Sequence, residues 1–463
     1  MKEKNTNKML GEIIKKIKPS RKELNEEQEI VKKLIKKIKE TEGKHVGVEL
    51  AGSIARNTHL RGDRDIDLFV MFPKQLSREE FVREGLRIGK RVLKGFEWEE
   101  AYSEHPYIRG EMHGFEVEIV PSYKIKSTAE LKSSVDRTPF HNAYLQKKLK
   151  TKQKDEVRLL RQFLKGIECY GSDIRAESFP GYLVELIIVE YNSFLKALEN
   201  VAKWKKGKII DLARFYKNEE EAKKKFPHHL VVVDPTDKNR NVAAALSFNQ
   251  FSRFIAASRA FLNKPSKNFF FGKKKKALNK GKMNGLLKKR ELLAVEIAYP
   301  KNLLADIAWG QLRRLKRKLA GQLEQKEFKT IRSTDWTDEK SIMVILIELE
   351  RLKIPEIEKR IGPEVIDESN SEKFLKANKK ILSGPRIEEG RWVIERIRAN
   401  TNAANFLKEY LKKTKKESKP LMKRALKKKC NVLEKEKISR LCKNKEFAVF
   451  LSDYLQGEEK FLE

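Results

Sequence analysis

The feature that most constrains the fold of this chain is a short apolar segment that carries two carboxylates. Residues 65–72 read DIDLFVMF, in which Asp65 and Asp67 alternate with Ile66 and Leu68. Successive side chains of a β-strand point to opposite faces of its sheet, so a strand here places both aspartates on one face. Unpaired acids are costly in an apolar strand, which indicates that the two carboxylates share a cation.

A third carboxylate lies on a later apolar segment. Residues 115–120 (FEVEIV) are predicted to form a strand that is ended by Pro121. Glu118 is the expected partner of the two aspartates, and Glu116, which shares its face, is the alternative. Carboxylate oxygens suit Mg²⁺, and three of them can hold a pair of ions that activates a hydroxyl and stabilises a leaving pyrophosphate.

The elements expected around these acids describe a small α/β unit. Two amphipathic helices fit residues 9–40, and a strand fits residues 46–50. The strand is followed by Gly52 and Ser53, whose backbone amides and hydroxyl can approach a phosphate group. A helix is expected at residues 77–93, where a serine cap precedes acidic residues in the first turn.

The remainder of the chain is predicted to be largely helical. Residues 155–261 have helical spacing, interrupted by turn residues at 234–247. Lys-rich residues 264–290 form a boundary; their run Lys273–Lys276 is expected to be a solvated loop, with contact to RNA as the alternative. Beyond it, strand-like pieces such as residues 293–297 alternate with basic helices, and the chain ends in a helical, Lys-dense tail.

Length and charge suggest several units and a polyanionic partner. A chain of 463 residues is too long for one core. We predict an α+β, multidomain protein with a catalytic unit at residues 1–150, a helical unit at 151–262 and a basic body with a tail at 263–463. The 102 basic residues exceed the 66 acidic ones by 36, and this net charge of +36 favours nucleic acid as the partner.

Targeting signals and metal-ligating cysteines are not expected. The first residues contain no continuous apolar stretch, and the longest apolar run, residues 342–347, is too short to cross a bilayer. Cys169, Cys430 and Cys442 show no metal-ligand spacing and are expected to be reduced thiols. The sequence therefore predicts a soluble cytoplasmic protein.

Several segments, in order along the chain, resemble the archaeal-type (class I) CCA-adding enzymes, tRNA nucleotidyltransferases of the polymerase-beta superfamily. They are GSIARNTHLRGDRDIDLFVMFP, EHPYIRGEMHGFEVEIVP, VDRTPFH, EVRLLRQFLKGIECYGSD, DPTDKNRNVAAALS, AWGQLRRLKRKLAGQLE and GRWVIERIR. The first alone is shared with poly(A) polymerases, whereas VDRTPFH and RNVAAALS are more discriminating. The resemblance implies a polymerase-beta-like head, a helical neck and an α/β body with a tail.

The resemblance also implies an activity and the residues that perform it. The activity is template-independent addition and repair of the 3′-terminal CCA of tRNA, with CTP and ATP as donors and Mg²⁺ as the cofactor. The implied metal ligands are Asp65, Asp67 and Glu118; the implied nucleotide-binding residues are Ser53 and Arg56 at the phosphates, His141, Arg161 and Tyr170 in the triphosphate and sugar pocket, and Arg240 at the base.

Alternatives remain at some of these positions. His141 could instead cap the helix after Pro139, and Tyr170 could instead close a helix end. Family members usually carry Asp where Glu118 stands and Lys where Arg161 stands, and Arg and Lys are not interchangeable at a tight site. The rival functions are a poly(A) polymerase-like or other RNA terminal nucleotidyltransferase and a basic RNA-binding protein whose site has lapsed. Relatives of this type are often dimers, so a homodimer is expected.

Overall fold

The structure is a computed structural model that describes residues 2–102, 104–171, 177–272, 276–300, 303, 305–379, 381–417 and 420–462. The chain forms two compact units. The first comprises Met1–Lys273 and Glu459–Glu463, and the second comprises Lys274–Glu458. The division into three parts at residues 150 and 262 stays a prediction.

The first unit begins with two helices and a five-stranded sheet, which we call the head sheet. Its strands lie in the order β1-β2-β5-β4-β3, and only the central β2–β5 pair is parallel among neighbours. The elements are α1 (Lys2–Ile17), α2 (Arg21–Lys39), β1 (Gly47–Ala51), α3 (Gly52–Arg56), β2 (Asp65–Pro73), α4 (Arg78–Val92), β3 (Trp98–Tyr102), β4 (Pro106–Met112) and β5 (Phe115–Lys124).

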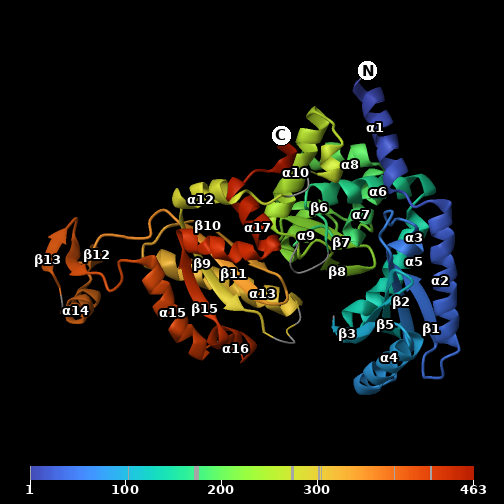
Figure 1. Ribbon diagram of the computed structural model, residues 1–463, viewed down its shortest axis with the longest axis horizontal. Coiled ribbons are helices and arrows are strands. Elements are labelled where there is room, and N and C mark those ends of the chain that lie inside the picture. Colours follow the sequence, from blue (N-terminus) through green and yellow to red (C-terminus); the bar gives the residue numbers. More distant parts are fainter. Residues whose placement is uncertain are drawn as a thin grey trace. The chain divides into compact units, whose positions relative to one another are not determined.

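Helices α2 and α4 cover one face of the head sheet (Figure 1), and a smaller buried cluster that includes Phe69, Tyr107 and Val120 lies on the other face. Ile66 and Leu68 of β2 pack into the core beneath these helices, together with Phe81 of α4. Each helix begins where the sequence supplies a cap, because Ser20 and Ser77 accept hydrogen bonds from backbone amides of the first turn. The aliphatic face of β2 is therefore fixed, and its aspartates point the other way.

The prediction that Pro121 ends the third strand is wrong. Strand β5 continues through Pro121, which is in register with Val70 of β2, and ends at Lys124. On its other side β5 pairs with β4 only as far as Ile119, opposite Ile108. Pro121 thus lies where β5 has become an edge strand on that side, and its missing N–H removes no bond to β4.

The rest of the first unit is mainly helical, built around a cluster of buried phenylalanines that includes Phe163, Phe254 and Phe261. Its helices are α5 (Thr138–Lys148), α6 (Thr151–Gly166), α7 (Gly181–Tyr191), α8 (Phe194–Val201), α9 (Glu219–Lys225), α10 (Phe248–Asn263) and α11 (Asn268–Phe271), with 3₁₀ turns η1 (Thr128–Glu130), η2 (Ser134–Arg137) and η4 (Lys460–Leu462).

A small sheet interrupts these helices, which the helical prediction for residues 155–261 missed. It consists of β6 (Lys208–Ile210), β7 (Leu230–Asp234) and β8 (Asp237–Asn241). The run LVVVD of β7 is fully buried and rich in β-branched valine, which favours a strand over a helix. The turn chemistry expected at residues 234–247 is confined to the hairpin between β7 and β8 and to the residues before α10.

The second unit contains two antiparallel sheets, ordered β10-β11-β9-β15 and β12-β14-β13. Its elements are α12 (Lys280–Lys288), β9 (Glu291–Ala298), α13 (Ala305–Gln325), β10 (Thr330–Thr337), β11 (Ile342–Leu349), β12 (Ile357–Glu364), α14 (Glu368–Ala377), β13 (Ser383–Glu388), β14 (Arg391–Ile397), α15 (Ala403–Glu417), α16 (Pro420–Lys428), β15 (Cys430–Glu434), η3 (Lys435–Lys443) and α17 (Lys445–Gln456).

One prediction for this part needs correction. The tail is not wholly helical, because β15 adds a strand to the sheet by pairing with β9. Helices α11 and α12 lie on either side of the run Lys273–Lys276, which was expected to be a solvated loop. Lys273–Lys275, the core of the proposed RNA-contacting run, lie outside the described residues, and Lys276 is exposed.

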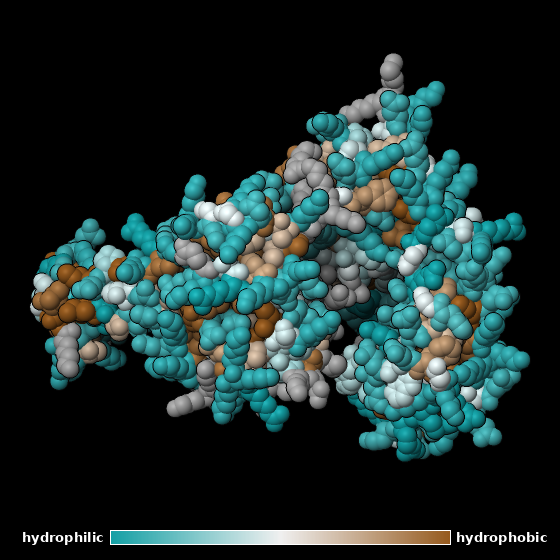
Figure 2. All heavy atoms as spheres, viewed as in Figure 1, coloured by the Kyte–Doolittle hydropathy of each residue, from teal (hydrophilic) through white to brown (hydrophobic). Residues whose placement is uncertain are grey.

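Surface and thiol properties complete the description. The face shown in Figure 2 is mostly hydrophilic, with brown apolar patches between charged side chains. Among the described residues, every helix is too short or too polar to span a membrane. Cys169, Cys430 and Cys442 are not joined in disulfides, and Cys169 is buried.

Candidate active site

The face of the head sheet opposite α2 and α4 brings four carboxylates together. Asp65 and Asp67 project from the same face of β2, and the parallel register pairs them with Glu116 and Glu118 of β5, respectively. Side chains in register on neighbouring strands share a face, so all four acids lie on the side away from α4. Both the predicted third acid, Glu118, and its alternative, Glu116, therefore stand beside the aspartates.

Burial and the repulsion of neighbouring carboxylates make Asp65 and Asp67 hard to ionise. Burial raises the pKa of Asp67 to about 7, and the negative charges of Glu118 and Asp65 add to the shift. Burial also raises the pKa of Asp65, and the neighbouring charge of Asp63 contributes to that rise. A divalent cation relieves such repulsion, so the donor set of this face fits a metal ion of the Mg²⁺ type.

Glu118 is held by neighbours on β4 rather than by the aspartates. Arg109, its register partner, donates from Nε to Glu118 Oε1 at 2.9 Å, and the Tyr107 hydroxyl donates to the same oxygen at 3.1 Å. Within the part of the chain that the structure describes, no three His, Cys, Asp or Glu side chains stand in a metal-binding arrangement. A cation that binds Glu118 has to compete with the ion pair between Glu118 and Arg109.

Gly52 is required by the close approach of Asp67. Its backbone has φ +69°, and a Cβ atom at this position would lie 1.9 Å from Asp67 Oδ2. The strand β1 ends one residue earlier, and Ser53 follows in the first turn of α3, partly exposed. The Gly-Ser pair of the sequence therefore lies against the second aspartate.

Replacing Gly52 with alanine is expected to lower the rate of the nucleotide addition that the sequence predicts by at least about 100-fold, since the methyl group displaces the Asp67 carboxylate. Gly95→Ala is the matched control: Gly95 also has positive φ, at +93°, but a Cβ there meets nothing within 4 Å. Steady-state incorporation assays compare the two variants. Equal losses in both would mean that backbone strain, rather than contact with Asp67, is responsible.

Arg56 lies in a buried network that joins the head sheet to α7. Its Nε and Nη2 donate to Glu185 at 3.0 and 2.8 Å, and its Nη1 donates to Asn142 Oδ1 at 3.1 Å. Glu185 also accepts from the Thr58 hydroxyl at 2.6 Å. The positive charge of Arg56 opposes the rise in the pKa of Asp67, so the guanidinium is close enough to influence that carboxylate. Two of its five N–H groups remain for a phosphate.

His141 and Arg240 meet at a single buried acid, Asp234, which the sequence prediction missed. His141 Nε2 lies 2.7 Å from Asp234 Oδ2, and Arg240 Nη1 donates to the same oxygen at 2.8 Å. Burial alone would raise the pKa of Asp234, but the His141, Thr236 and Arg240 hydrogen bonds hold it well below its usual value. The His141 ring also stacks on Tyr182, with centroids 4.0 Å apart. Asp234 therefore orients both predicted nucleotide-binding side chains.

Arg161 and Tyr170 form a third group, beside Gly181. The Arg161 guanidinium lies over the Tyr170 ring at 5.5 Å, and its buried Nε has no hydrogen-bond partner within the part of the chain that the structure describes. A Cβ on Gly181 would lie 3.2 Å from both Arg161 Nη2 and the Tyr170 hydroxyl, so α7 begins tightly against this pair. Burial raises the pKa of Tyr170, which keeps its hydroxyl protonated as a donor.

The first turns of α7 connect these groups, through residues that the sequence prediction did not select. Gly181 contacts Arg161 and Tyr170, Tyr182 stacks on His141, and Glu185 binds Arg56. The available signal was an acid, Glu185, inside the apolar run GYLVELIIVEY, since a buried carboxylate needs a partner. Asp234 had a similar signal, at the end of LVVVD.

A pocket of about 580 Å³ adjoins the carboxylate face. Its lining includes Asp65, Glu116, Arg109 of β4 and the turn residue Gly114. This pocket therefore opens beside two of the four acids.

The sequence comparisons define the class to which this fold and site belong. Residues 31–141 match the nucleotidyltransferase domain family, residues 155–271 match the second domain of tRNA nucleotidyltransferase, and residues 288–435 match the C-terminal domain of the CCA-adding enzyme. The head sheet with its carboxylates is thus a nucleotidyltransferase domain, of the polymerase-beta superfamily.

Whole-chain relatives identify the family. The CCA-adding enzyme of Archaeoglobus fulgidus is 38% identical, over 79% of this chain and 81% of the relative. Those of Methanococcus maripaludis and Methanocaldococcus jannaschii are each 37% identical, over 80% and 81% of this chain and 85% and 84% of the relatives. This chain belongs to the archaeal-type CCA-adding enzyme family. A cytoplasmic RNA terminal U-transferase of known structure is 17% identical with a TM-score of 0.46, covering 57% of this chain and 95% of that chain.

Proposed function

We propose that this chain builds and repairs the 3′-terminal CCA of tRNA without a template, using CTP and ATP and releasing pyrophosphate. The observation that carries the proposal is the carboxylate face of the head sheet, with Gly52 against Asp67, in a chain that matches CCA-adding enzymes over about four fifths of its length. The net charge of +36 suits a tRNA substrate, whose phosphates would attract basic residues.

The acids are proposed to act as ligands of Mg²⁺. Asp65 and Asp67 would hold the ion from β2, and Glu118 would join them on release from Arg109 and Tyr107. When bound, Mg²⁺ supplies activation of the tRNA 3′-hydroxyl and neutralisation of the charge on the leaving pyrophosphate. Positioning and electrostatic stabilisation then account for catalysis, because phosphoryl transfer needs no covalent enzyme intermediate.

The other predicted residues are proposed to bind the nucleotide. Arg161 would bind the triphosphate and sugar as a buried cation whose Nε lacks a hydrogen-bond partner among the described residues. Tyr170 would donate from its protonated hydroxyl. Burial lowers the pKa of His141, which favours a neutral imidazole fixed by Asp234. Arg240, fixed by the same acid, would bind the base edge of C or A. These roles, with phosphate binding by Ser53 and Arg56, are proposals about individual side chains.

Stepwise addition to a tRNA that lacks its CCA tests the proposed function. With CTP alone we expect two additions, with ATP alone none, and with both nucleotides a product that stops after one A. Sequencing gels of end-labelled tRNA resolve these products. A long A tail would identify a poly(A) polymerase-like enzyme instead, and absence of any addition, with tRNA binding retained, would indicate a lapsed site. A homodimer remains a proposal drawn from the family.

A further inference from the structure

Arg161 shares its helix face with a second cation. Lys165 lies one turn later on α6, and residues four apart on a helix are neighbours on its surface. Both cations lie over the ring of Tyr170, Arg161 at 5.5 Å and Lys165 at 5.4 Å from its centroid. They differ in access: the Arg161 side chain is 3% exposed, whereas that of Lys165 is 35% exposed. Lys165 is thus the accessible member of the pair.

The carboxylate of Asp63 lies beside both cations. Lys165 Nζ donates to Asp63 Oδ1 at 2.8 Å, and Arg161 Nη1 lies 3.9 Å from Asp63 Oδ2. The second distance is too long for a hydrogen bond, and no hydrogen-bond partner for Arg161 Nε is found among the described residues. A buried guanidinium with so few acceptors is unusual, because unmet donors cost free energy. The group is therefore short of one anion.

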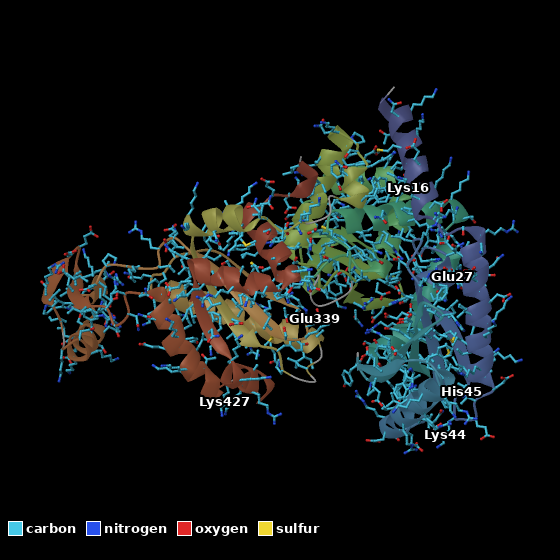
Figure 3. The ribbon with its side chains drawn as sticks, viewed as in Figure 1. Lys16, Glu27, Lys44, His45, Glu339 and Lys427 are labelled. Carbon is cyan, nitrogen blue, oxygen red and sulfur yellow. The ribbon has the colours of Figure 1, made fainter. Side chains whose placement is uncertain are left out.

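The Asp63 ion pair is not needed to hold its own loop. Residues 57–64 connect α3 to β2, and Arg158 donates to the carbonyls of Asn57 and His59 at 2.7 and 2.9 Å. The buried His59 ring is also paired with Glu27 of α2, at 3.1 Å (Figure 3 labels Glu27). With these anchors in place, contact between Asp63 and Lys165 can break without releasing the loop.

Asp63 also connects this group to the carboxylate face. It lies two residues before Asp65, the first residue of β2, and it accepts the hydrogen bond from Lys165. Lys165 is therefore tied to the start of the strand that carries Asp65 and Asp67, while its ammonium group also lies over the ring of Tyr170.

We propose that Lys165 binds the triphosphate of the incoming nucleotide together with Arg161, and that Asp63 is an internal counter-anion which the triphosphate displaces. The inference rests on the proposed function, since it assigns a residue to the nucleotide of that reaction. The polyphosphate tail is the chemistry that fits, because a lysine and a buried arginine together match an extended, multiply charged anion.

The test is binding of CTP and ATP to the full-length protein without tRNA, by isothermal titration calorimetry in EDTA, where neither turnover nor a metal ion contributes. Lys165→Met should raise the Kd of either triphosphate by about tenfold, the scale of one lost charged contact. The Kd of CMP, which lacks the polyphosphate tail, should change by less than about twofold. Asp63→Asn should tighten triphosphate binding by roughly threefold, because the displaced anion is gone.

Two further variants control for structure. Lys165→Arg keeps the charge and should bind triphosphates within about threefold of the parent protein, and Lys152→Met, on the same helix but exposed, should have no effect. The proposal is overturned if Lys165→Met binds triphosphates normally, or if Asp63→Asn weakens binding as a structural ion pair would. Failure of the stepwise CCA assay by the parent protein would instead reject the proposed function, whatever these binding constants show.

Discussion

Asp67→Asn is expected to lower the rate of CMP addition by at least about 1000-fold while leaving the protein folded. The asparagine has nearly the same shape but removes one of the charges proposed to hold Mg²⁺, and removal of a single electrostatic element of a catalytic centre costs on this order. Single-turnover addition to tRNA lacking CCA measures the loss. Titration with Mn²⁺, followed by electron paramagnetic resonance, should show weaker metal binding in parallel.

The same variant should be more stable than the parent protein in metal-free buffer. Asp67 has a pKa of about 7 in the folded protein, above the value near 3.9 for an unfolded chain. A raised carboxyl pKa means that stability falls as pH rises from about 4 to about 7, because the folded protein holds the proton more tightly. The variant lacks this loss of stability. The difference in free energy of unfolding between the variant and the parent protein should therefore grow from about pH 4 to about pH 7 and reach on the order of 2–4 kcal/mol.

Urea unfolding in EDTA at pH 4.5 and pH 8 checks the stability change, with Glu199→Gln, an exposed position on α8, as the control. Added Mg²⁺ should stabilise the parent protein and not the variant, since a ligand that binds only the folded state shifts unfolding. A variant with full activity would remove Asp67 from the metal site. A stability difference that does not change with pH would show that the acid is not buried among like charges.

Local alternation was enough to predict the carboxylate face. Asp65 and Asp67 belong to an apolar strand whose period is two, so their common face followed from spacing alone. The same reasoning placed Glu116 and Glu118 on one face of the next strand but could not choose between them. That choice depends on the register of β5 with β2 and on the contact between Arg109 of β4 and Glu118. The spacing of residues within one strand predicts neither.

Contacts between distant segments were beyond the reach of the sequence argument. Asp234 binds His141 across 93 positions, and Glu185 binds Arg56 across 129 positions. The sequence around Asp234 or Glu185 does not predict which residue each acid binds. The prediction of a wholly helical tail failed for a related reason. Strand β15 is stabilised by its pairing with β9 rather than by the strand propensity of its own residues.

The buried pair of Arg56 and Glu185 should have the largest effect on stability. Glu185 is completely buried and accepts two hydrogen bonds from Arg56 and one from Thr58. Glu185→Ala would leave the guanidinium, itself 9% exposed, without its counter-ion. Breaking a buried pair from one side typically costs about 3–5 kcal/mol, so the free energy of unfolding should fall by that amount. Chemical denaturation, followed through the unfolding transition of the first unit, measures this fall in the free energy of unfolding.

Replacing both partners separates this structural role from a catalytic one. In Arg56→Met with Glu185→Leu, apolar side chains of similar volume fill the site, and such exchanges are often close to neutral, so stability should return to within about 2 kcal/mol of the parent protein. Activity should not return if Arg56 presents its two remaining N–H groups to a phosphate beside Asp67. Recovery of both stability and full activity would assign Arg56 only to joining α3 with α7 and α5. Binding of the nucleotide phosphates would then depend on Arg161 and its neighbours.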